Sequence, residues 1–327
     1  MIFFTRLISF LSLLLVLSAC SENGESNANS DAEFPAKSIK VIIPFGPGGL
    51  ADVSMRLLGE PLGEILGERL VMENRPGAGG VAATTTMLNA DADGHTLIVL
   101  TNGTTIAETL FENLPYQITQ ELIPISAVAW FDLVLLTNPD AGYQTLQELL
   151  AAKGNDLRIA TINPGSTQNL TAELFKSRAN IDATIIPYRT TPDTLGALLR
   201  NEVDLVIDAF TALKGAIDNN QAQALAVTGE IRNSALPNIP TVQETGIEDF
   251  VVTGWNALYT KAGTDPQIIS KLNQEIAAVL ATDDIKARFS DLGIEARATT
   301  PEEMQQQLLS DIEKWRQVIL STGIDTL

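Results

Sequence analysis

The 327-residue chain has very few of the side chains on which many catalytic and metal sites depend. It contains one cysteine, Cys20, and one histidine, His95. One cysteine cannot form an internal disulfide, and this pair cannot build a zinc cluster of His and Cys ligands. Little is left for a Cys-His or Ser-His-Asp site. Carboxylate pairs remain possible because Asp and Glu number 40, but no spacing singles one out. We therefore expect a protein that is not an enzyme and that uses neither a metal nor a cofactor.

Basic residues are also scarce. Lys and Arg number 21 against 40 Asp and Glu, so the formal net charge is -19. This charge repels the phosphate backbone, and nucleic acid is not an expected partner. It also repels anionic ligands at long range, although salt screens distant charges over roughly 8 to 10 Å. An anion site in this chain would therefore depend on donors that act at contact, such as backbone N–H groups.

The one long apolar run near the N-terminus has the features of a secretion signal. Arg6 precedes the apolar residues 7–17, which are too few to span a bilayer comfortably, and Leu17-Ser18-Ala19-Cys20 follows. This pattern resembles a bacterial lipoprotein signal, so we expect residues 1–19 to be removed and a lipid to be attached to Cys20. The alternative is a conventional signal peptide in which Cys20 is incidental. The polar residues 20–35 are expected to form a flexible tether.

The first Gly-rich turn is the main candidate for a binding site. Residues 39–45 are apolar and rich in β-branched side chains, which predicts a buried parallel strand. Gly46-Pro47-Gly48-Gly49 cannot continue that strand, and a helix is expected to start at 50–52. Free N–H groups and the positive end of a helix dipole then lie at the carboxyl end of a strand, where an anion binds well. Such a turn can also join a strand to a helix with no ligand.

A second turn of the same kind makes the ligand interpretation stronger. Asn163-Pro164-Gly165-Ser166-Thr167 follows an apolar strand at 157–162 and precedes a helix. Two such turns could bind one anion from two sides.

The rest of the chain alternates strands with helices, which predicts a parallel α/β sheet with ligands beyond the carboxyl ends of its strands. Helix 51–66 contains Pro61, so a kink or break is expected there. The apolar stretches 125–138 and 250–259 are expected to cross between two domains. Helices are expected to begin after Asp265 and Thr300, the second with a capping box. Further strands are predicted at 69–73, 95–100, 184–188, 203–207 and 222–228.

A third Gly-rich turn suggests a different function. Gly77 to Ala82 fits the loose dinucleotide fingerprint G-x-G-x-x-A, as in a nucleotide-dependent oxidoreductase. That fingerprint needs an acidic residue about 20 positions on, at the end of the next strand. Thr101 and Asn102 stand there instead, so we interpret the match as coincidental.

Taken in order, seven motifs resemble the tripartite tricarboxylate transporter receptor family, also called Bug proteins. The resemblance covers nearly all of the chain after the tether. The motifs are IIPFGPGGLADVSMR, ENRPGAGGVAA, DGHTLIV, NPGSTQNLTAELF, VDLVIDAF, LPNIPTVQETG and GWNALYTKAGTDP.

The resemblance implies an α/β, two-domain periplasmic-binding-protein-like fold of type II with the ligand in the interdomain cleft. Domain 1 would consist of residues 36–131 and 254–327, and domain 2 of residues 132–253. The implied protein is a monomeric periplasmic or cell-surface receptor, anchored to a bacterial membrane through lipidated Cys20. It would capture a small organic carboxylate and deliver it to a tripartite tricarboxylate-type membrane permease. A ligand sensor that feeds a signalling partner is the alternative.

The resemblance also implies roles for individual residues. Backbone donors of the first two turns, with ordered waters, would hold the ligand carboxylate. Asp52 would order its turn or cap the helix. Asp208, at the end of a strand, would meet an amino or hydroxyl group of the ligand, and the alternative is that it caps a helix or binds water. Many relatives carry His where this chain has Asn169, so that position adds no charge here. The expected ligand-binding residues are Phe45, Gly46, Gly48, Gly49, Leu50, Asp52, Asn102, Gly165, Ser166, Thr167, Asn169, Asp208, Phe210, Thr253 and Trp255.

A dedicated arginine is not required for such a site. Hydrogen bonds to a charged group contribute roughly 1.5 to 3 kcal/mol each. Micromolar affinity corresponds to about 8 kcal/mol, which a few well-placed donors can supply.

Overall fold

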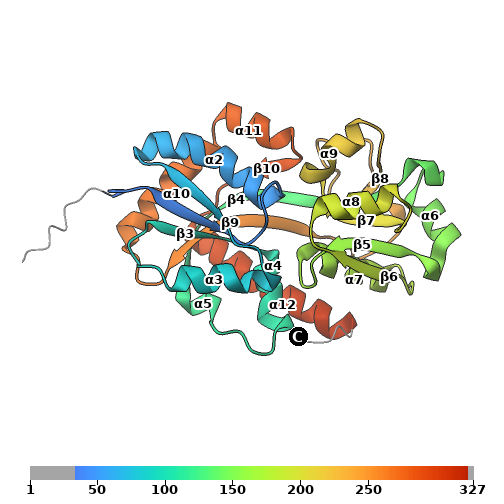
Figure 1. Ribbon diagram of the computed structural model, residues 1–327, viewed down its shortest axis with the longest axis horizontal. Coiled ribbons are helices and arrows are strands. Elements are labelled where there is room, and N and C mark those ends of the chain that lie inside the picture. The colour runs from blue at the N-terminus through green and yellow to red at the C-terminus, as the bar shows by residue number, and fades with distance from the viewer. Residues whose placement is uncertain (1–33, 323–327) are drawn as a thin grey trace, which may run out of the picture. The chain divides into compact units, whose positions relative to one another are not determined.

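The apolar strands of the sequence assemble into one mixed sheet, as a computed structural model of the chain shows (Figure 1). The structure describes residues 34–322, and those from Lys37 onward belong to one compact unit. Within the described residues the sheet has ten strands in the order β2-β1-β3-β9-β4-β7-β5-β6, with β8 and β10 also paired to β4. The predicted signal segment, Cys20 and the tether up to residue 33 lie outside the described residues.

The first group of strands is parallel, as predicted. β1 (Ile39–Ile43) lies between β2 (Leu70–Asn74) and β3 (Thr96–Thr101) and pairs with both. α2 (Leu50–Leu66) and α3 (Val81–Leu88) connect them. The boundaries agree with the predicted ranges to within one residue or two, because apolar runs and Gly-rich turns mark them clearly.

Helix α2 does not break at Pro61. A proline inside a helix removes one N–H donor and crowds the preceding turn. Here Leu58 and Leu62, on either side of Pro61, are fully buried against the core, and this packing keeps the helix continuous. Of the two expected outcomes, the break was therefore wrong, and the kink stays a prediction.

The second group of strands is also parallel. β5 (Arg158–Ile162) lies between β6 (Thr184–Tyr188) and β7 (Leu205–Ala209). α7 (Thr167–Arg178) follows β5, and α8 (Thr191–Leu199) follows β6.

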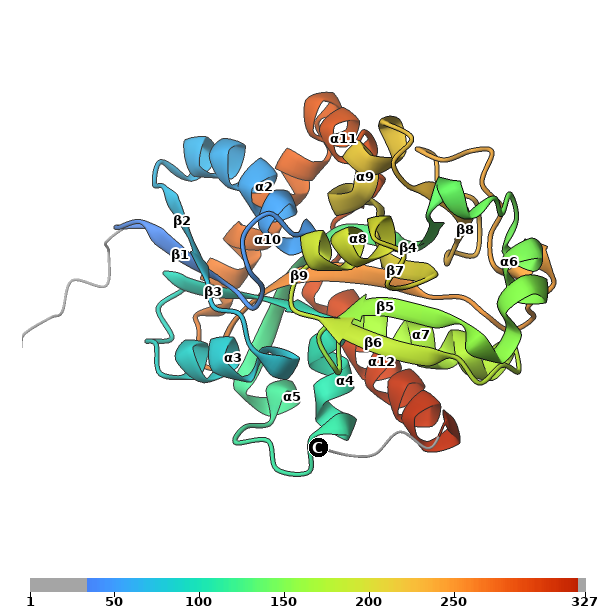
Figure 2. The ribbon, with the colours of Figure 1, turned by 45° about the vertical axis from the view of Figure 1, so that its right-hand side comes forward.

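The long strand β4 (Leu122–Thr137) takes part in both groups (Figure 2). Its first part runs antiparallel to β9 (Thr253–Lys261), and the last pair of that ladder is Asp132 with Thr253. From Leu133 onward β4 pairs with β7 and, from Val134, with β8 (Gln223–Val227). The change of partner falls next to the domain limits expected from the sequence, while the limits themselves stay a prediction.

The helices near the C-terminus form where the sequence places their caps. α10 (Pro266–Leu280) begins after Asp265, whose side chain accepts the N–H of Gln267. α12 (Pro301–Thr322) begins with the predicted capping box between Thr300 and Glu303. α12 packs on β4, α4 and α7 through an apolar face that includes the fully buried Met304, Leu308 and Trp315.

Several short elements were not predicted from the sequence, because none has a long apolar period of its own. Helix α6 (Leu146–Lys153) has Thr145 as its N-cap, and the spacing of Thr145 and Glu148 is that of a capping box. The unpredicted elements are α4 (Asn102–Leu110), α5 (Ile118–Glu121), α9 (Phe210–Asp218), α11 (Asp283–Ser290) and β10 (Ile294–Ala296).

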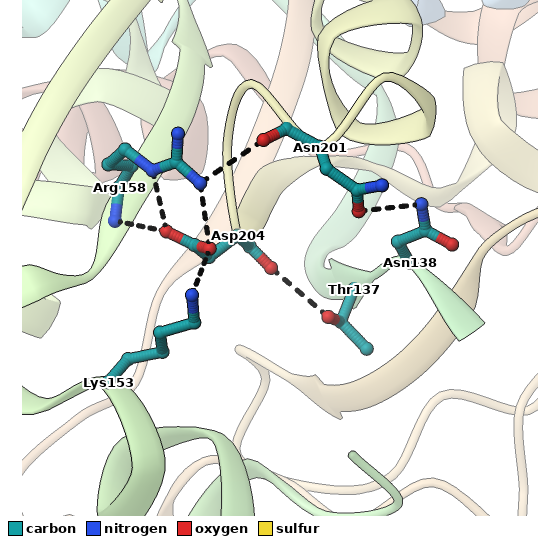
Figure 3. Close-up of polar contacts among 6 residues, drawn as sticks. All are labelled: Thr137, Asn138, Lys153, Arg158, Asn201 and Asp204. Carbon is teal, nitrogen blue, oxygen red and sulfur yellow. Dashed lines mark hydrogen bonds and ion pairs between the residues drawn. The ribbon is translucent and has the colours of Figure 1, made fainter. Parts of the chain in front are cut away.

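An ionic network around Asp204 joins the amino ends of β5 and β7 (Figure 3). The Asp204 carboxylate accepts hydrogen bonds from Arg158 Nε at 2.9 Å and Nη2 at 3.0 Å, and it pairs with Lys153 Nζ at 2.9 Å. Arg158 Nη2 also donates to the backbone carbonyl of Asn201. The side-chain oxygen of Asn201 accepts a hydrogen bond from Asn138 Nδ2. Burial opposes ionisation of Asp204, but the hydrogen bonds from Arg158 and Lys153 outweigh burial and lower its pKa.

Asp204→Asn is expected to lower the free energy of unfolding by about 2 kcal/mol at neutral pH, because Arg158 and Lys153 lose a buried charged partner. The folded-state pKa lies below the ordinary 3.8, so this stabilisation is present above that value and is lost as pH falls through the folded pKa. Urea unfolding at several pH values should show the difference from the unchanged protein shrinking in acid. Asp182→Asn, which removes an exposed partner of Lys176, is the control and should change little.

Candidate ligand-binding cleft

A cavity of about 640 Å³ lies where strands from both groups end. This volume is in the range of about 300 to 1,000 Å³ that small-molecule sites occupy. The side of the sheet formed by β1, β2, β3, β9 and the first part of β4 contributes residues 44–51, Pro76, Gly77, Thr101, Phe131 and Asn256. The second group contributes residues 162–164, Thr167, Gln168, residues 189–192, Asp208, Ala209 and Ala212.

Another hollow, of about 570 Å³, lies along α2 and β2. Three acids, Glu60, Glu64 and Glu68, line it against two basic residues, Arg56 and Arg69, so its net charge does not favour an anion. The cavity at the strand ends is therefore the better candidate for the anion site.

The turn after β1 is held in shape by Asp52. Gly48 has a φ of +84°, which favours glycine, and its N–H donates to Asp52 Oδ2 at 3.0 Å. The same carboxylate accepts from Arg56 Nε at 2.9 Å and from Asn74 Nδ2 at 3.0 Å. Burial opposes ionisation of Asp52, yet these hydrogen bonds outweigh it and lower its pKa. Asp52 orders the turn, and it does not cap α2, whose N-cap residue is Gly49.

The turn after β5 repeats this design. Gly165 has a φ of +75° and donates its N–H to Asn169 Oδ1 at 3.2 Å. Asn169 therefore has the same role in the second turn as Asp52 has in the first. Each of the two residues lies four positions after a glycine, and that glycine follows a proline. The shared pattern Pro-Gly-x-x-x-Asp/Asn is visible in the sequence and could have identified both roles. Like Asp52, Asn169 does not line the cavity.

The two turns leave four N–H groups available at the cavity wall. Leu50 and Ala51 begin α2, and Thr167 and Gln168 begin α7. The first N–H groups of a helix have no partner within it, and among the described residues none of these four has another acceptor. All four residues line the cavity, so an anion there would meet two helix N-termini.

Gly165 and Ser166 were expected to donate to the ligand, but the structure uses their N–H groups internally. Gly165 donates to Asn169, and Ser166 donates to the Asn163 carbonyl at 3.1 Å. A Cβ on Gly165 would lie 2.7 Å from the Leu110 side chain, so this part of the turn packs against α4. The available donors of α7 lie one and two residues further on. Phe45, Gly46, Gly48 and Gly49 line the cavity, but the Gly48 N–H, also expected to donate to the ligand, donates to Asp52 instead.

Four more of the expected ligand-binding residues do not line the cavity. Asn102 is 1% exposed because its side chain accepts the Trp255 N–H at 2.9 Å and donates to Asp311 at 3.4 Å. The Trp255 ring is fully buried in the core and donates Nε1–H to the same carboxylate. Phe210 packs close to Gly293, and Thr253 pairs with Asp132 in the sheet. Their positions next to strand ends suggested a place in the site, but Asn102, Phe210 and Trp255 are buried in the interior, and half-buried Thr253 does not line the cavity.

Asp208 lines the cavity and is 1% exposed. Its Oδ1 accepts from Gln168 Nε2 and from the Ala209 N–H, both at 2.8 Å, and its Oδ2 accepts from Thr191 Oγ1 at 2.6 Å. Burial raises the pKa of Asp208, and these hydrogen bonds offset that effect only in part. The carboxylate therefore links the starts of α7 and α8 to β7.

Arg189 is a cavity residue that was not predicted. It follows β6 directly, and among the described residues its exposed side chain has no ion-pair or hydrogen-bond partner. The rule that ligands bind at the carboxyl ends of parallel strands, applied to strand 184–188, would have found it. Gln168, Thr191 and Asn256 also line the cavity and were not predicted.

Gly79 of the Gly77 to Ala82 turn has no room for a dinucleotide to approach, although Gly77 lines the cavity. A Cβ on Gly79 would meet the side chains of Phe111 and Ala107 at 2.7 and 2.9 Å, so α4 and the residue after it cover this glycine. Thr101 and Asn102, at the position of the ribose-binding acid, cap and begin that helix. This geometry gives no support to the oxidoreductase alternative.

Two further features concern function. Residues 34–322 contain no group of three or more His, Cys, Asp or Glu side chains that could hold a metal ion. In that part of the chain no helix is both long and apolar enough to cross a bilayer.

Known proteins resemble this chain in sequence and in fold. Residues 54–324 match the model of the tripartite tricarboxylate transporter family receptor. Protein BugT of Bordetella pertussis is 32% identical over 324 residues, which cover 98% of each chain. Rpa4515 of R. palustris, solved with adipate, is 27% identical to this chain and superposes on it with a TM-score of 0.86. The superposition covers 90% of this chain and 100% of Rpa4515. MatC of Rhodopseudomonas palustris, solved with bound malate, is 29% identical and has a TM-score of 0.80, and the superposition covers 88% of this chain and 100% of MatC.

The same α/β fold occurs in solved periplasmic binding proteins, which confirms the fold class predicted from the sequence. The family match and the BugT identity extend over most of the chain, so they concern the whole protein and not one motif. The chain belongs to the tripartite tricarboxylate transporter receptor family.

Proposed function

We propose that this protein is an extracytoplasmic solute-binding receptor that captures a small organic carboxylate in the cavity described above. The observation that carries the proposal is the set of four available N–H groups, two at the start of α2 and two at the start of α7, along one cavity. Each hydrogen bond to a carboxylate contributes roughly 1.5 to 3 kcal/mol, so the set is sufficient for micromolar binding. The adipate and malate in two relatives are ligands of the same class.

The proposal includes closure of two domains on the ligand. Domain 1 would be residues 36–131 and 254–327, and domain 2 residues 132–253. If one carboxylate binds donors of both turns, the closed state gains affinity that the open state lacks. In a protein of net charge -19, these short-range donors offset the long-range repulsion of an anion.

The direct test is calorimetry against aliphatic dicarboxylates, tricarboxylates, aromatic acids and acidic amino acids, with the corresponding amides as controls. We expect at least one acid to bind with micromolar affinity and its amide not to bind measurably, because the donors act on the charged oxygens. If none of the acids binds, the receptor hypothesis fails. Binding of a reduced nicotinamide, followed by its fluorescence, would instead favour the oxidoreductase alternative.

The proposed location is a bacterial membrane surface facing the periplasm or the exterior, with the protein held by lipid on Cys20. The proposal rests on Leu17-Ser18-Ala19-Cys20 after an apolar run. We expect Cys20→Ser to move the protein from the membrane to the soluble fraction without changing ligand affinity. Mass spectrometry of the native protein that finds residue 20 unmodified would contradict the anchor.

Delivery to a tripartite tricarboxylate-type permease is the proposed use of the bound ligand, and a signalling partner is the alternative. Measuring ligand uptake by cells that lack this protein distinguishes the permease hypothesis from the signalling hypothesis. A receptor for a permease is required for uptake, whereas a sensor alters only the response to the ligand.

A further inference from the structure

Thr228 joins the chain segments that pass between the two proposed domains. Its N–H donates to the Leu133 carbonyl at 2.9 Å, and its carbonyl accepts the Val252 N–H at 2.8 Å. Its hydroxyl accepts the Leu133 N–H at 2.9 Å and donates to the Val252 carbonyl at 2.7 Å. Leu133 and Val252 lie within one residue of the ends of the proposed domain 2, residues 132–253. Closure of the domains would therefore pivot at this junction.

Two neighbouring residues of β4 point to opposite faces of the sheet beside this junction. Phe131 lines the cavity, whereas Asp132 does not. The Asp132 side chain covers Gly229 instead, because a Cβ on Gly229 would lie 2.6 Å from the carboxyl carbon and 2.6 Å from each carboxyl oxygen. These equal distances show that the carboxyl group lies flat over the glycine. The cavity and this carboxyl group are thus one residue apart on the same strand.

Asn233 connects Asp132 to a segment of the other proposed domain. The Asn233 side chain is 9% exposed and hydrogen-bonds to Asp132. Its Nδ2 also donates to the carbonyl of Gly293, the residue before β10, at 3.4 Å. Beside it, Thr211 Oγ1 donates to the Leu292 carbonyl at 2.8 Å. Asp132, Asn233 and Gly293 therefore form a bridge across the junction, which we call the Asp132 latch.

The Asp132 carboxyl group is difficult to ionise in this latch. Burial raises its pKa to about 6, the charge of Glu295 on β10 adds to that effect, and the hydrogen bond from Asn233 offsets it only in part. Glu295 itself pairs with Arg297 at 3.4 Å. From the loop after β8 and from β9, Asp132 faces the uncharged side chains of Asn233 and Thr253. Its protonation is therefore governed by how deeply the latch buries it and by Glu295.

From this geometry we propose that the Asp132 latch is a proton-sensitive control of domain closure, which makes the receptor hold its ligand more tightly in a more acidic medium. The inference rests on the proposed function, to which it adds a control. The described arrangement places donors of both turns along one cavity, and in it Asp132 keeps a proton up to about pH 6. An arrangement that hydrates Asp132 favours the carboxylate. Protonation therefore stabilises the arrangement that binds, and ionisation weakens it.

The expected size of the effect follows from the two protonation states. The pKa is about 6 when the latch is formed and returns toward the ordinary 3.8 when Asp132 is hydrated. Ligand affinity should therefore fall about three- to tenfold as the pH rises from about 5 to about 7.5. Asp132→Asn cannot ionise, so it should keep the latch closed at every pH in this range. At neutral pH it should be at least as stable as the unchanged protein, because asparagine avoids a buried charge.

The first test measures closure without any ligand. Nitroxide labels are attached to Glu64→Cys on α2 and Ser177→Cys on α7, both exposed positions, in a Cys20→Ser chain, and the distance between them is measured by pulsed electron resonance. The closed population should grow as the pH falls through about 6 and should stay high at all pH values in Asp132→Asn. Glu295→Gln removes a charge that opposes ionisation, so the midpoint should move to lower pH. A purely structural role of Asp132 would not cause that shift.

The second test is calorimetry at both ends of this pH range with the acid of the panel above that binds most tightly. The ligand and Asp208 titrate equally in the unchanged protein and in Asp132→Asn, so the difference between the two reports Asp132 alone. Glu230→Gln, which removes an exposed acid next to Gly229, is the matched control and should keep the pH dependence.

Two results would overturn the inference while leaving carboxylate capture intact. One is a label distance that does not change with pH in the unchanged protein, and the other is an Asp132→Asn variant with the same pH response. Failure of every acid to bind would overturn the proposed function, whereas the measurement without ligand would still test the latch.

Discussion

Leu50→Pro is expected to weaken carboxylate binding by about 10- to 100-fold, which corresponds to loss of one hydrogen bond to a charged group. Proline at this position removes one of the four available N–H groups and little else from the backbone. Leu50 is the first residue of α2, where proline is well tolerated. Gly49 before it is already extended, with φ of -78° and ψ of 171°, as the residue before a proline requires.

Leu50→Ala provides the matched control. Leu50 is 8% exposed, and both variants lose its side chain, so both should lose similar stability. Only the proline variant lacks the N–H group. Calorimetry with the preferred acid should therefore separate the two variants, with Leu50→Ala much nearer the unchanged protein. Equal affinities for the two would show that the Leu50 N–H does not bind the carboxylate, and the proposed set of four donors would be wrong.

Asp311→Ala is expected to lower the free energy of unfolding by about 3 to 5 kcal/mol, the largest stability effect predicted for a single side chain here. Asp311 on α12 is 5% exposed, and its Oδ2 accepts from Trp255 Nε1, from Gln307 Nε2 at 2.9 Å and from Asn102 Nδ2 at 3.4 Å. Alanine would leave these buried donors without an acceptor, which costs more than the net value of each hydrogen bond.

Two further variants check this explanation by urea unfolding. Asp311→Asn keeps one oxygen of the same shape, and since all three donors meet a single oxygen, it should recover a substantial part of the stability. Glu313→Ala, on the exposed side of the same helix, removes an acid that pairs with Arg316 and should have little effect. If Asp311→Asn were as unstable as Asp311→Ala, the buried hydrogen bonds would not be the cause.

Patterns local in the sequence predicted much of the fold. The strands β1, β5 and β6 appear as apolar runs, and the starts of α6, α10 and α12 have capping residues whose hydrogen bonds the structure contains. The turns at Gly48 and Gly165 were recognisable because a Pro-Gly pair at the end of a strand is typical of a turn. Such features depend on neighbours in the chain, so the sequence records them directly.

The candidate site was predicted mainly where backbone groups form it, together with the side chains of Phe45 and Asp208. The expected donors at Leu50 and Thr167 line the cavity, whereas Asn102 and Trp255 are buried around Asp311, which lies far away in the sequence. A polar or aromatic residue beside a strand end can face a cleft or the core, and its own neighbours in the chain do not distinguish the two. The alternation of the sheet and the packing of α12 decide which way these side chains face.

By itself the sequence determined the α/β alternation, the two Gly-rich turns and the composition that disfavours His- or Cys-based chemistry, because these are properties of short segments. The tertiary structure alone decided that both turns line one cavity and that Asp52 and Asn169 hold them in shape. It alone also placed Arg189 in that cavity without a partner. These facts depend on which distant segments meet, and the free energy that brings them together comes from burial of the whole sheet between its helices.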